Sequence, residues 1–337
     1  MPLGQPPRGF FYLHFAACSR QIEYAPYLQR PANTVRQSVV GFKTDSVGRN
    51  SRICQAPTFA KVDGTTLTLK DLTLVGGTNP STGKPIALTR ANNNIKFFGS
   101  DGNMQLIKND TTLEAFNKTA FDAYKSDTDE LQFVYVDAQK HWFLYQDSGY
   151  TYPMDDYPLE AGRGYLLFAN NALGYGAKMT DSGSVRDEKV EVNIGRNSRT
   201  MAGNIAPCDM KLKEFTLTSG LNPSTGKPIA FTRANNNIKF FGADGNMQLL
   251  KNETDLETFC KEAYDTFKSD TDELQFVFVE AKAHWYLYQD SGYLYPMDEY
   301  VIKAGRGMIP FAGNALGFGM TFTMPPAIQK PVEVVEE

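Results

Sequence analysis

The feature that most constrains this sequence is an internal repeat. The segment from Asn79 to Gly176 recurs without a gap as Asn222 to Gly319, about 143 residues further along, and roughly three in four aligned positions are identical. Where the copies differ, they mostly exchange side chains of similar chemistry, such as Tyr135 for Phe278. A chain of 337 residues also has the length of about two domains. The sequence therefore predicts two tandem domains of one fold.

The repeat extends upstream of this block, because the turn Gly48-Arg49-Asn50-Ser51-Arg52 recurs as Gly195-Arg196-Asn197-Ser198-Arg199. Thr180 to Ser184 is rich in polar residues, and we interpret it as the linker. The predicted division is an extended, proline-containing arm or leader at 1–35, domains at 36–184 and 185–324, and an acidic tail at 325–337.

Both copies contain many short apolar runs that are separated by Gly, Pro and Asn turns. Leu131 to Val136 is rich in aromatic and β-branched residues, which favour strands, and the Asp147-Ser148-Gly149 turn predicts a hairpin that begins at Trp142. This pattern predicts mainly β domains of sandwich or barrel-like form. Each domain also carries one expected amphipathic helix, whose apolar face consists of Leu113, Phe116, Ala120 and Tyr124 in the first copy.

Composition and charge exclude some classes of partner. The chain is 42% hydrophobic and 12% aromatic with a formal net charge of -4, and its Lys and Arg residues are scattered. We therefore expect no nucleic-acid partner. No apolar run is long enough to span a bilayer. Arg8, the apolar stretch Gly9 to Ala17 and Cys18 have the layout of a short export or lipoprotein signal, although a structured leader is the other interpretation.

The cysteines at 18, 54, 208 and 260 have no counterparts at equivalent places in the other copy. Cys54 and Cys208 follow the shared Gly-Arg-Asn-Ser-Arg turns, so the sequence allows a bridge between domains or buried free thiols.

Acidic residues cluster between the predicted helix and the next strand in each copy. They are Asp127, Asp129 and Glu130, and then Asp270, Asp272 and Glu273. Calcium prefers several oxygen ligands from one compact loop, so these clusters are candidate metal sites. The spacing is not that of an EF-hand, and a solvated connection is the alternative interpretation.

Aromatic residues concentrate in the predicted hairpin of each copy. The candidate ligand-binding set is Trp142, Tyr145, Tyr150 and Tyr152, with Trp285, Tyr288, Tyr293 and Tyr295 in the second copy. Rings beside amides and carboxylates stack on sugars, which suggests glycan binding, but half of the rings in a strand are expected to face the core. His141 and His284 lack an accompanying nucleophile or metal motif, and Arg163 and Arg306 are interpreted as turn or ion-pair residues.

Several short motifs together carry a resemblance. Val39 to Phe42, the Gly48-Arg49-Asn50 turn, Leu69 to Leu72, the Trp hairpin and Ala161 to Gly164 look like a diffuse group of secreted bacterial β-domain proteins of unknown function. The resemblance covers both repeats and neither terminal arm, and this chain departs from the group because it lacks an obvious long signal peptide. It implies an exported, non-catalytic protein.

The expected function is structural or adhesive, at the cell surface or outside the cell, with self-assembly into filaments or a surface layer. An extended arm that adds a strand to an open sheet edge would supply the contact. The alternative is a pair of carbohydrate-binding modules. A hydrolase ranks third, because the carboxylates of Asp155, Asp156 and Glu160 would have to face one cleft.

Overall fold

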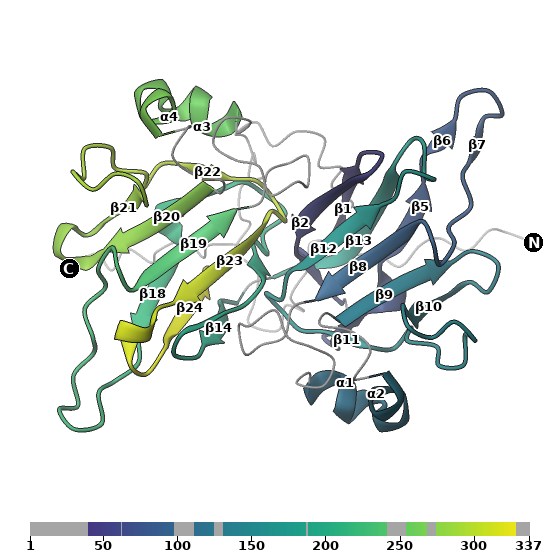
Figure 1. Ribbon diagram of the computed structural model, residues 1–337, viewed down its shortest axis with the longest axis horizontal. Coiled ribbons are helices and arrows are strands. Elements are labelled where there is room, and N and C mark those ends of the chain that lie inside the picture. The colour runs from purple at the N-terminus through teal and green to yellow at the C-terminus, as the bar shows by residue number, and fades with distance from the viewer. Residues whose placement is uncertain are drawn as a thin grey trace, which may run out of the picture.

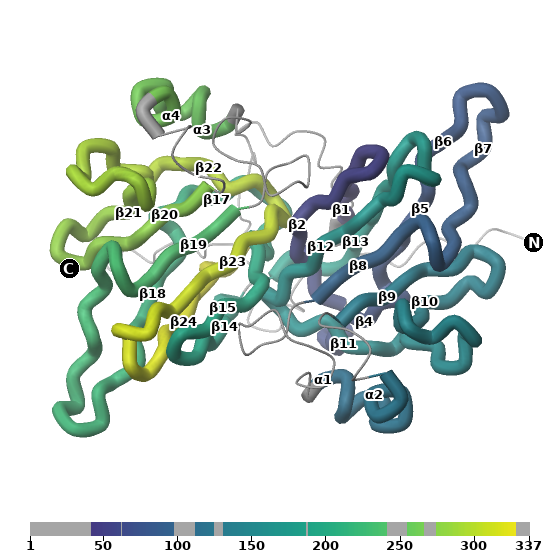
Figure 2. Tube along the Cα trace, viewed as in Figure 1, coloured from purple at the N-terminus to yellow at the C-terminus, as the bar shows by residue number. Residues whose placement is uncertain are grey.

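The computed structural model describes residues 40–61, 63–97, 111–124, 131–186, 188–240, 254–267 and 274–327. The fold is mainly β, and the ladders between its strands are antiparallel. Figures 1 and 2 show two groups of sheets side by side, the first half (40–186) in purple to teal and the second half (188–327) in green to yellow. The predicted arm at 1–35 and the acidic tail from 328 lie outside the described residues.

The first half contains an open five-stranded sheet in the order β10-β9-β8-β12-β2. Its strands are β2 (Ser51–Gln55), β8 (Asn93–Phe97), β9 (Leu131–Val136), β10 (His141–Leu144) and β12 (Tyr165–Ala169). A four-stranded sheet comprises β1 (Val40–Val47), β3 (Phe59–Ala60), β5 (Thr73–Gly76) and β13 (Ala177–Val185). The first half also has two separate two-stranded pairs: β4 (Leu67–Thr68) with β11 (Pro158–Leu159), and β6 (Thr78–Asn79) with β7 (Lys84–Pro85).

The second half repeats this arrangement. Its larger sheet contains β15 (Ser198–Arg199), β16 (Ala202–Gly203), β19 (Asn236–Phe240), β20 (Leu274–Val279), β21 (His284–Leu287) and β23 (Gly307–Ala312). Its smaller sheet contains β14 (Val190–Ile194), β18 (Thr216–Ser219) and β24 (Met320–Met324), and a short pair joins β17 (Met210–Lys211) to β22 (Val301–Ile302). The 3-10 turns are η1 (Leu69–Asp71), η3 (Leu212–Glu214), η5 (Glu280–Lys282) and η6 (Asn314–Leu316).

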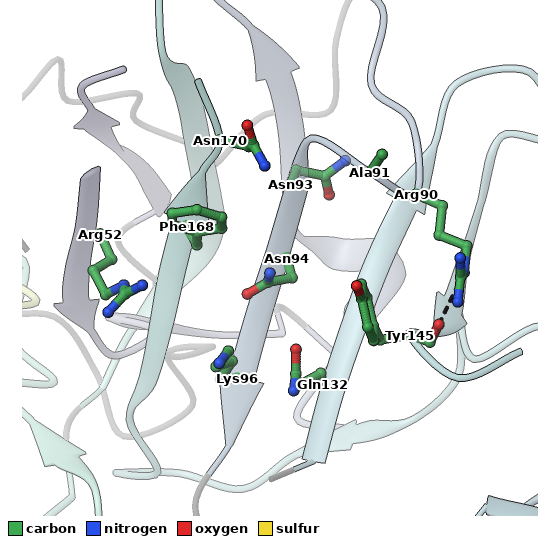
Figure 3. A pocket seen from close by; sticks show the side chains of 10 residues that line it. All are labelled: Arg52, Arg90, Ala91, Asn93, Asn94, Lys96, Gln132, Tyr145, Phe168 and Asn170. Atoms are coloured by element: carbon green, nitrogen blue, oxygen red, sulfur yellow. Dashed lines mark hydrogen bonds between the residues drawn. The ribbon is translucent and has the colours of Figure 1, made fainter. Parts of the chain in front are cut away.

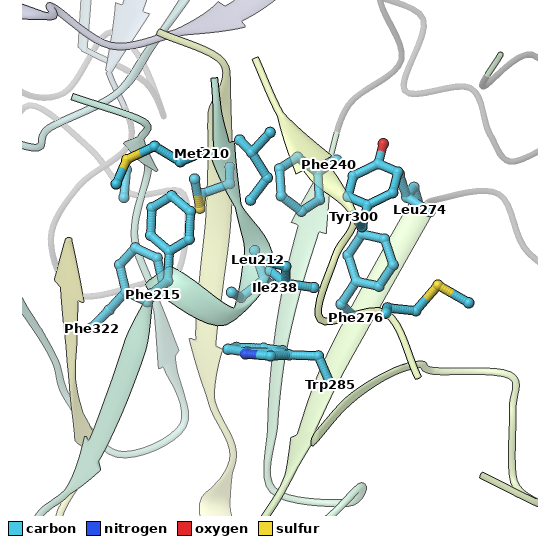
Figure 4. Packing of buried hydrophobic residues seen from close by; sticks show 14 of the residues in the cluster. Met210, Leu212, Phe215, Ile238, Phe240, Leu274, Phe276, Trp285, Tyr300 and Phe322 are labelled. Carbon is cyan, nitrogen blue, oxygen red and sulfur yellow. The ribbon is translucent and has the colours of Figure 1, made fainter. Parts of the chain in front are cut away.

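Each half has its own hydrophobic core, to which its larger and smaller sheets both contribute. In the second half, Phe276 and Trp285 of the larger sheet and Phe322 of the smaller sheet belong to one buried cluster (Figure 4). Aromatic rings fill much of this space, and Phe276 lies 4.8 Å from Tyr300 between ring centroids. Alternate residues of each strand face this core, as the period of two requires.

The single helix expected in each domain is wrong in detail, because two short helices occupy its place. They are α1 (Thr111–Phe116) and α2 (Lys118–Tyr124), with α3 (Thr254–Phe259) and α4 (Lys261–Phe267) in the second half. Asn117 separates α1 from α2, and its side-chain oxygen accepts the backbone N–H of Ala120, which caps the second helix. The predicted apolar face is buried nevertheless, since Leu113 and Ala120 are inaccessible to solvent.

Two further expectations require correction. Among the described residues the sheets are open, so the barrel-like alternative is wrong. The predicted linker from Thr180 to Ser184 is part of strand β13, where it pairs with Val40 to Thr44. Asp181 in this segment is 3% exposed, and its carboxylate accepts hydrogen bonds from the Thr58 hydroxyl and the Thr58 backbone N–H. The polar residue at this position therefore serves a buried hydrogen bond.

The two halves meet through equivalent elements. Gln55 forms an antiparallel β-bridge with Arg306, and Arg163 forms one with Ala202. Arg306 is the equivalent of Arg163 in the second copy, and Ala202 is the equivalent of Gln55. Beside these bridges lies a buried cluster of Cys54, Leu166, Met201 and Ile309. In Figure 1, a half-turn about the viewing direction exchanges α1 and α2 with α3 and α4. The contact between the halves therefore has approximate two-fold symmetry.

The cysteines at 54, 208 and 260 are free thiols, so the bridge that the sequence allowed between Cys54 and Cys208 does not form. Burial raises the pKa of the Cys54 thiol well above its ordinary value, because the thiolate would lose its hydration in the contact between the halves.

Candidate ligand-binding face

The aromatic candidates separate into buried and exposed rings. Trp142 and Trp285 are 1% and 2% exposed and belong to the two hydrophobic cores. In contrast, Tyr145 and Tyr288 are 38% and 37% exposed. Among the candidates, these two tyrosines are therefore the most exposed to solvent.

The remaining candidate tyrosines are partly buried. Tyr150 packs on Phe143 with 5.1 Å between ring centroids, and Tyr293 makes the same contact with Tyr286. Tyr152 packs edge-on against Tyr124, and its counterpart Tyr295 packs against the second core. These rings hold the hairpin loop against its sheet and do not form one continuous stacking surface.

The candidate calcium ligands Asp127, Asp129 and Glu130, and Asp270, Asp272 and Glu273, lie outside the described residues. Within the part of the chain that the structure describes, no group of three or more His, Cys, Asp or Glu residues has metal-site geometry. Calcium binding at these acidic clusters stays a prediction.

The hairpin histidines have carboxylate partners. The Nδ1 atom of His141 lies 2.8 Å from an Asp155 oxygen, while the other oxygen of Asp155 accepts the backbone N–H of Trp142 at 3.2 Å. The same arrangement joins His284 to Asp298 at 2.9 Å. These carboxylates tie a loop to the first residues of β10 and β21. They therefore have a structural use that needs no ligand.

The arginines between glycines are also structural. Arg163 bonds the Tyr157 hydroxyl at 3.1 Å and lies 5.0 Å from the centre of the Phe97 ring. Arg306 repeats the contact with the hydroxyl of Tyr300 at 3.3 Å. Their side chains thus bind within their own halves, while their main chains form β-bridges to the other half, to Ala202 and Gln55.

A constellation that the sequence did not single out lies on the outer face of the five-stranded sheet. Its register places Arg52 opposite Phe168 and Phe168 opposite Asn94. In the neighbouring row, Lys96 lies opposite Gln132, whose carbonyl accepts the Tyr145 backbone N–H. Figure 3 shows these side chains on adjacent strands around a shared opening of about 310 Å³, which Arg90, Ala91, Asn93 and Asn170 also line.

Guanidinium groups cover the aromatic rings of this face. Arg52 lies 5.2 Å from the Phe168 ring centre and Arg90 lies 5.0 Å from that of Tyr145. The Nε of Arg90 also donates to the Tyr145 carbonyl at 2.9 Å, which fixes the plane of the guanidinium. Cation–π contact of this kind holds an arginine side chain in place without neutralising its charge.

At the centre of the face, Asn94 is 8% exposed, and its side-chain oxygen has no hydrogen-bond partner among the described residues. Its equivalent in the second half, Asn237, leaves the same oxygen without a partner. A buried amide oxygen that lacks a donor costs about 1–3 kcal/mol. Both copies share this feature, so each of the two faces carries the same unsatisfied acceptor.

The second half reproduces the face position by position. Arg199 pairs with Phe311 across the ladder and stacks 5.3 Å from its ring, and Asn237 is the next neighbour. Arg233 lies 4.8 Å from the Tyr288 ring and donates to its carbonyl at 2.8 Å. The remaining members, Lys239 and Gln275, lie opposite each other. Asn170 of the first half is replaced by Gly313, so the face of the second half has one fewer amide.

A signal for this face exists in the sequence. Asn94 and Lys96 alternate with Ile95 and Phe97, which is the pattern of a strand with one polar and one core-facing side. The alternation identifies the outer face of each strand, but the register between strands decides which polar residues become neighbours. Here Arg52 and Asn94 are brought to the same row through Phe168 although they are far apart in sequence.

Comparison with known proteins assigns no family. No family model matches the chain, and no curated protein matches it significantly. A solved structure described as "Structure of the Macrobrachium rosenbergii Nodavirus" is 7% identical over 95% of this chain and 94% of that chain, with a TM-score of 0.09. A TM-score this low carries no argument about fold or function. In the described residues, the helices are too short or too polar to cross a bilayer.

Proposed function

We propose that this chain is a non-catalytic binding protein in which two tandem β-sandwich domains, at 36–184 and 185–324, each present one sheet face to a saccharide. The observation that carries the proposal is the duplication of one outer-face constellation: a ring-backed arginine, a buried amide with an unused acceptor, and a lysine–glutamine pair. Two copies of a weak site raise the apparent affinity for a polymer through effective concentration.

Saccharide recognition uses several amides and charged groups on a shallow surface, because sugar hydroxyls both donate and accept hydrogen bonds. The face supplies amides from Asn94 and Gln132 and donors from Arg52 and Arg90. Tyr145 contributes a ring edge at the rim. The sequence suggested the Trp hairpins as the glycan-binding site, whereas we place the site on the adjoining sheet face.

A glycan array with the purified full-length chain tests the proposal. We expect binding to a subset of oligosaccharides or polysaccharides, and loss of that binding when Asn94 and Asn237 are both replaced by leucine. The matched control replaces the exposed Asn171 and Asn314, which bond Arg49 and Arg196 outside the face. An array without a binder above background, or equal binding by the leucine variant, would remove the sheet face from consideration.

Self-assembly into an exported structural or adhesive layer is the second candidate. It is supported by large apolar side chains that are exposed in the second half, namely Leu221 at 61%, Leu294 at 69% and Phe318 at 47%. Exposed apolar residues of this size are typical of contact surfaces when they gather into a patch. Negative-stain electron microscopy of the full chain, beside a variant that lacks residues 1–35, distinguishes the outcomes. Assembly that survives the deletion would refute strand addition by the arm.

A further inference from the structure

We infer that the ligand of the two sheet faces is an anionic polysaccharide, whose carboxylate or sulfate groups are held by the ring-backed arginines. The inference rests on the proposed function and narrows its ligand class. It is carried by three observations on this face: the sign of its charges, the support of its arginines, and the hydrogen-bonding character of its buried amide.

The first observation is charge. Among the described residues, those that line the opening in the first half include Arg52, Arg90 and Lys96, and none of them is Asp or Glu. The chain as a whole has a formal charge of -4, so this local sign is opposite to that of the molecule. A concentration of positive charge on a concave surface attracts anions and accelerates their association.

The second observation is the state of the arginines. Neither Arg52 nor Arg90 forms an ion pair among the described residues, and the same holds for Arg199 and Arg233. Each guanidinium lies over an aromatic ring, a contact that holds the side chain in place and leaves its charge unneutralised. A planar guanidinium that is already held in position binds carboxylate and sulfate oxygens with paired hydrogen bonds at a small entropic cost.

The same stacking argues against a nucleic-acid ligand. Base recognition on a sheet uses open aromatic faces as stacking platforms. Here Phe168 and Tyr145 each have one face covered by an arginine, at 5.2 Å and 5.0 Å. The rings therefore serve to position cations.

The third observation is the unpaired side-chain oxygen of Asn94, which accepts hydrogen bonds and donates none. A phosphodiester group or a sulfate ion offers no donor to this atom. A sugar hydroxyl does, so a ligand that carries both hydroxyl and anionic groups satisfies the amide and the arginines together. The equivalent oxygen of Asn237 makes the same demand in the second half.

The experiment measures binding of the full-length chain to immobilised polysaccharides by biolayer interferometry. Polygalacturonate is compared with its fully methyl-esterified form, and dextran sulfate with dextran, so that each anionic polymer has a neutral counterpart. Single-stranded DNA of similar charge is the third class of probe. We expect binding to at least one anionic polysaccharide, at least tenfold weaker binding to its neutral counterpart, and weakening as salt rises from low to physiological concentration.

The decisive variant is R52Q/R199Q, which removes one ring-backed arginine from each face. Loss of a charge-assisted hydrogen bond predicts at least a tenfold loss of affinity. The matched control K84Q/K227Q makes the same change in net charge at two exposed lysines, Lys84 of β7 and its counterpart Lys227, and is expected to bind as the wild type does. Circular dichroism and thermal unfolding verify that both variants are folded.

The outcomes separate the two proposals. Equal binding of esterified and free polygalacturonate, or of dextran and dextran sulfate, with loss of binding in R52Q/R199Q, would overturn the anionic assignment and leave saccharide binding intact. Absence of any polysaccharide binding would overturn both. Tighter binding of DNA than of every polysaccharide, or an equal loss in K84Q/K227Q, would show non-specific attraction of polyanions and would also overturn the inference.

Discussion

Asn93 joins β8 to β9 beside the proposed binding face, and its replacement by alanine tests this part of the fold. The side chain is 2% exposed and stands at the first residue of β8. Its amide nitrogen donates to the carbonyl oxygens of Thr89 and Tyr135 at 2.8 and 3.0 Å, and its oxygen accepts the Tyr135 N–H at 3.0 Å. The ladder between β8 and β9 reaches only to Ile95 and Phe133, so the Asn93 amide replaces the next main-chain pair.

The expected cost of N93A follows from the groups that it leaves without partners. Three main-chain groups lose a hydrogen bond: the Thr89 carbonyl and both the N–H and the carbonyl of Tyr135. An unsatisfied buried group costs about 1–3 kcal/mol, and partial access of water places the total at about 3–5 kcal/mol. Asn236 makes the same contacts to Thr232 and Phe278, so N236A is expected to cost a similar amount.

Urea unfolding followed by tryptophan fluorescence measures this cost, because each half has its own buried tryptophan, Trp142 or Trp285. With a denaturant slope of about 2–3 kcal/mol/M, the expected loss lowers the midpoint of the affected half by roughly 1–2 M. The control N171A removes an exposed asparagine and is expected to shift it by less than about 0.3 M, in line with surface substitutions. A shift for N93A no larger than that of the control would refute the role of this amide.

Two further predictions concern the contact between the halves and the pH dependence of stability. A Cβ at Gly164 would lie 2.6 Å from the Ala202 carbonyl oxygen, so G164A is expected to lower stability by about 1–3 kcal/mol in thermal unfolding, unlike G174A, whose Cβ meets no atom within 4 Å. Burial alone would raise the pKa of Asp71, but the Thr68 backbone N–H, which donates to it at 2.7 Å, helps to hold the pKa below its ordinary value. The carboxylate therefore stabilises the fold above about pH 4 and loses this effect as pH falls through the folded-state pKa. D71N is expected to unfold more easily than wild type at pH 7, and a difference that persists unchanged at pH 2 would contradict this cause.

Local patterns were sufficient for the parts of the fold that local chemistry decides. The aromatic and β-branched content of Leu131 to Val136 predicted a strand, and β9 has these bounds. The spacing of Leu113 and Ala120 predicted a buried helical face, which the structure has, although Asn117 interrupts the helix. These successes share a cause, since side-chain period and capping act over a few residues.

Features that depend on distant partners were not predictable in the same way. Thr180 to Ser184 has the composition of a linker, yet it pairs with β1 and buries Asp181 against Thr58. Trp142 lies in an aromatic hairpin that suggested a binding surface, but strand register turns its ring into the core. Sequence alone does not fix which strands pair or in what register, and these two facts decide which residues share a face.

The approximate two-fold relation between the halves constrains how a polymer meets the two faces. A half-turn about the viewing direction of Figure 1 approximately exchanges the halves, so the same rotation relates the two faces. A polysaccharide chain has a direction, and a half-turn reverses the direction of any chain that runs across the rotation axis. One straight chain that enters the first face in the favoured sense would therefore meet the second in the opposite sense. Two antiparallel chains, or one chain that folds back, satisfy both faces, which favours cross-linking of the ligand over tracking along it.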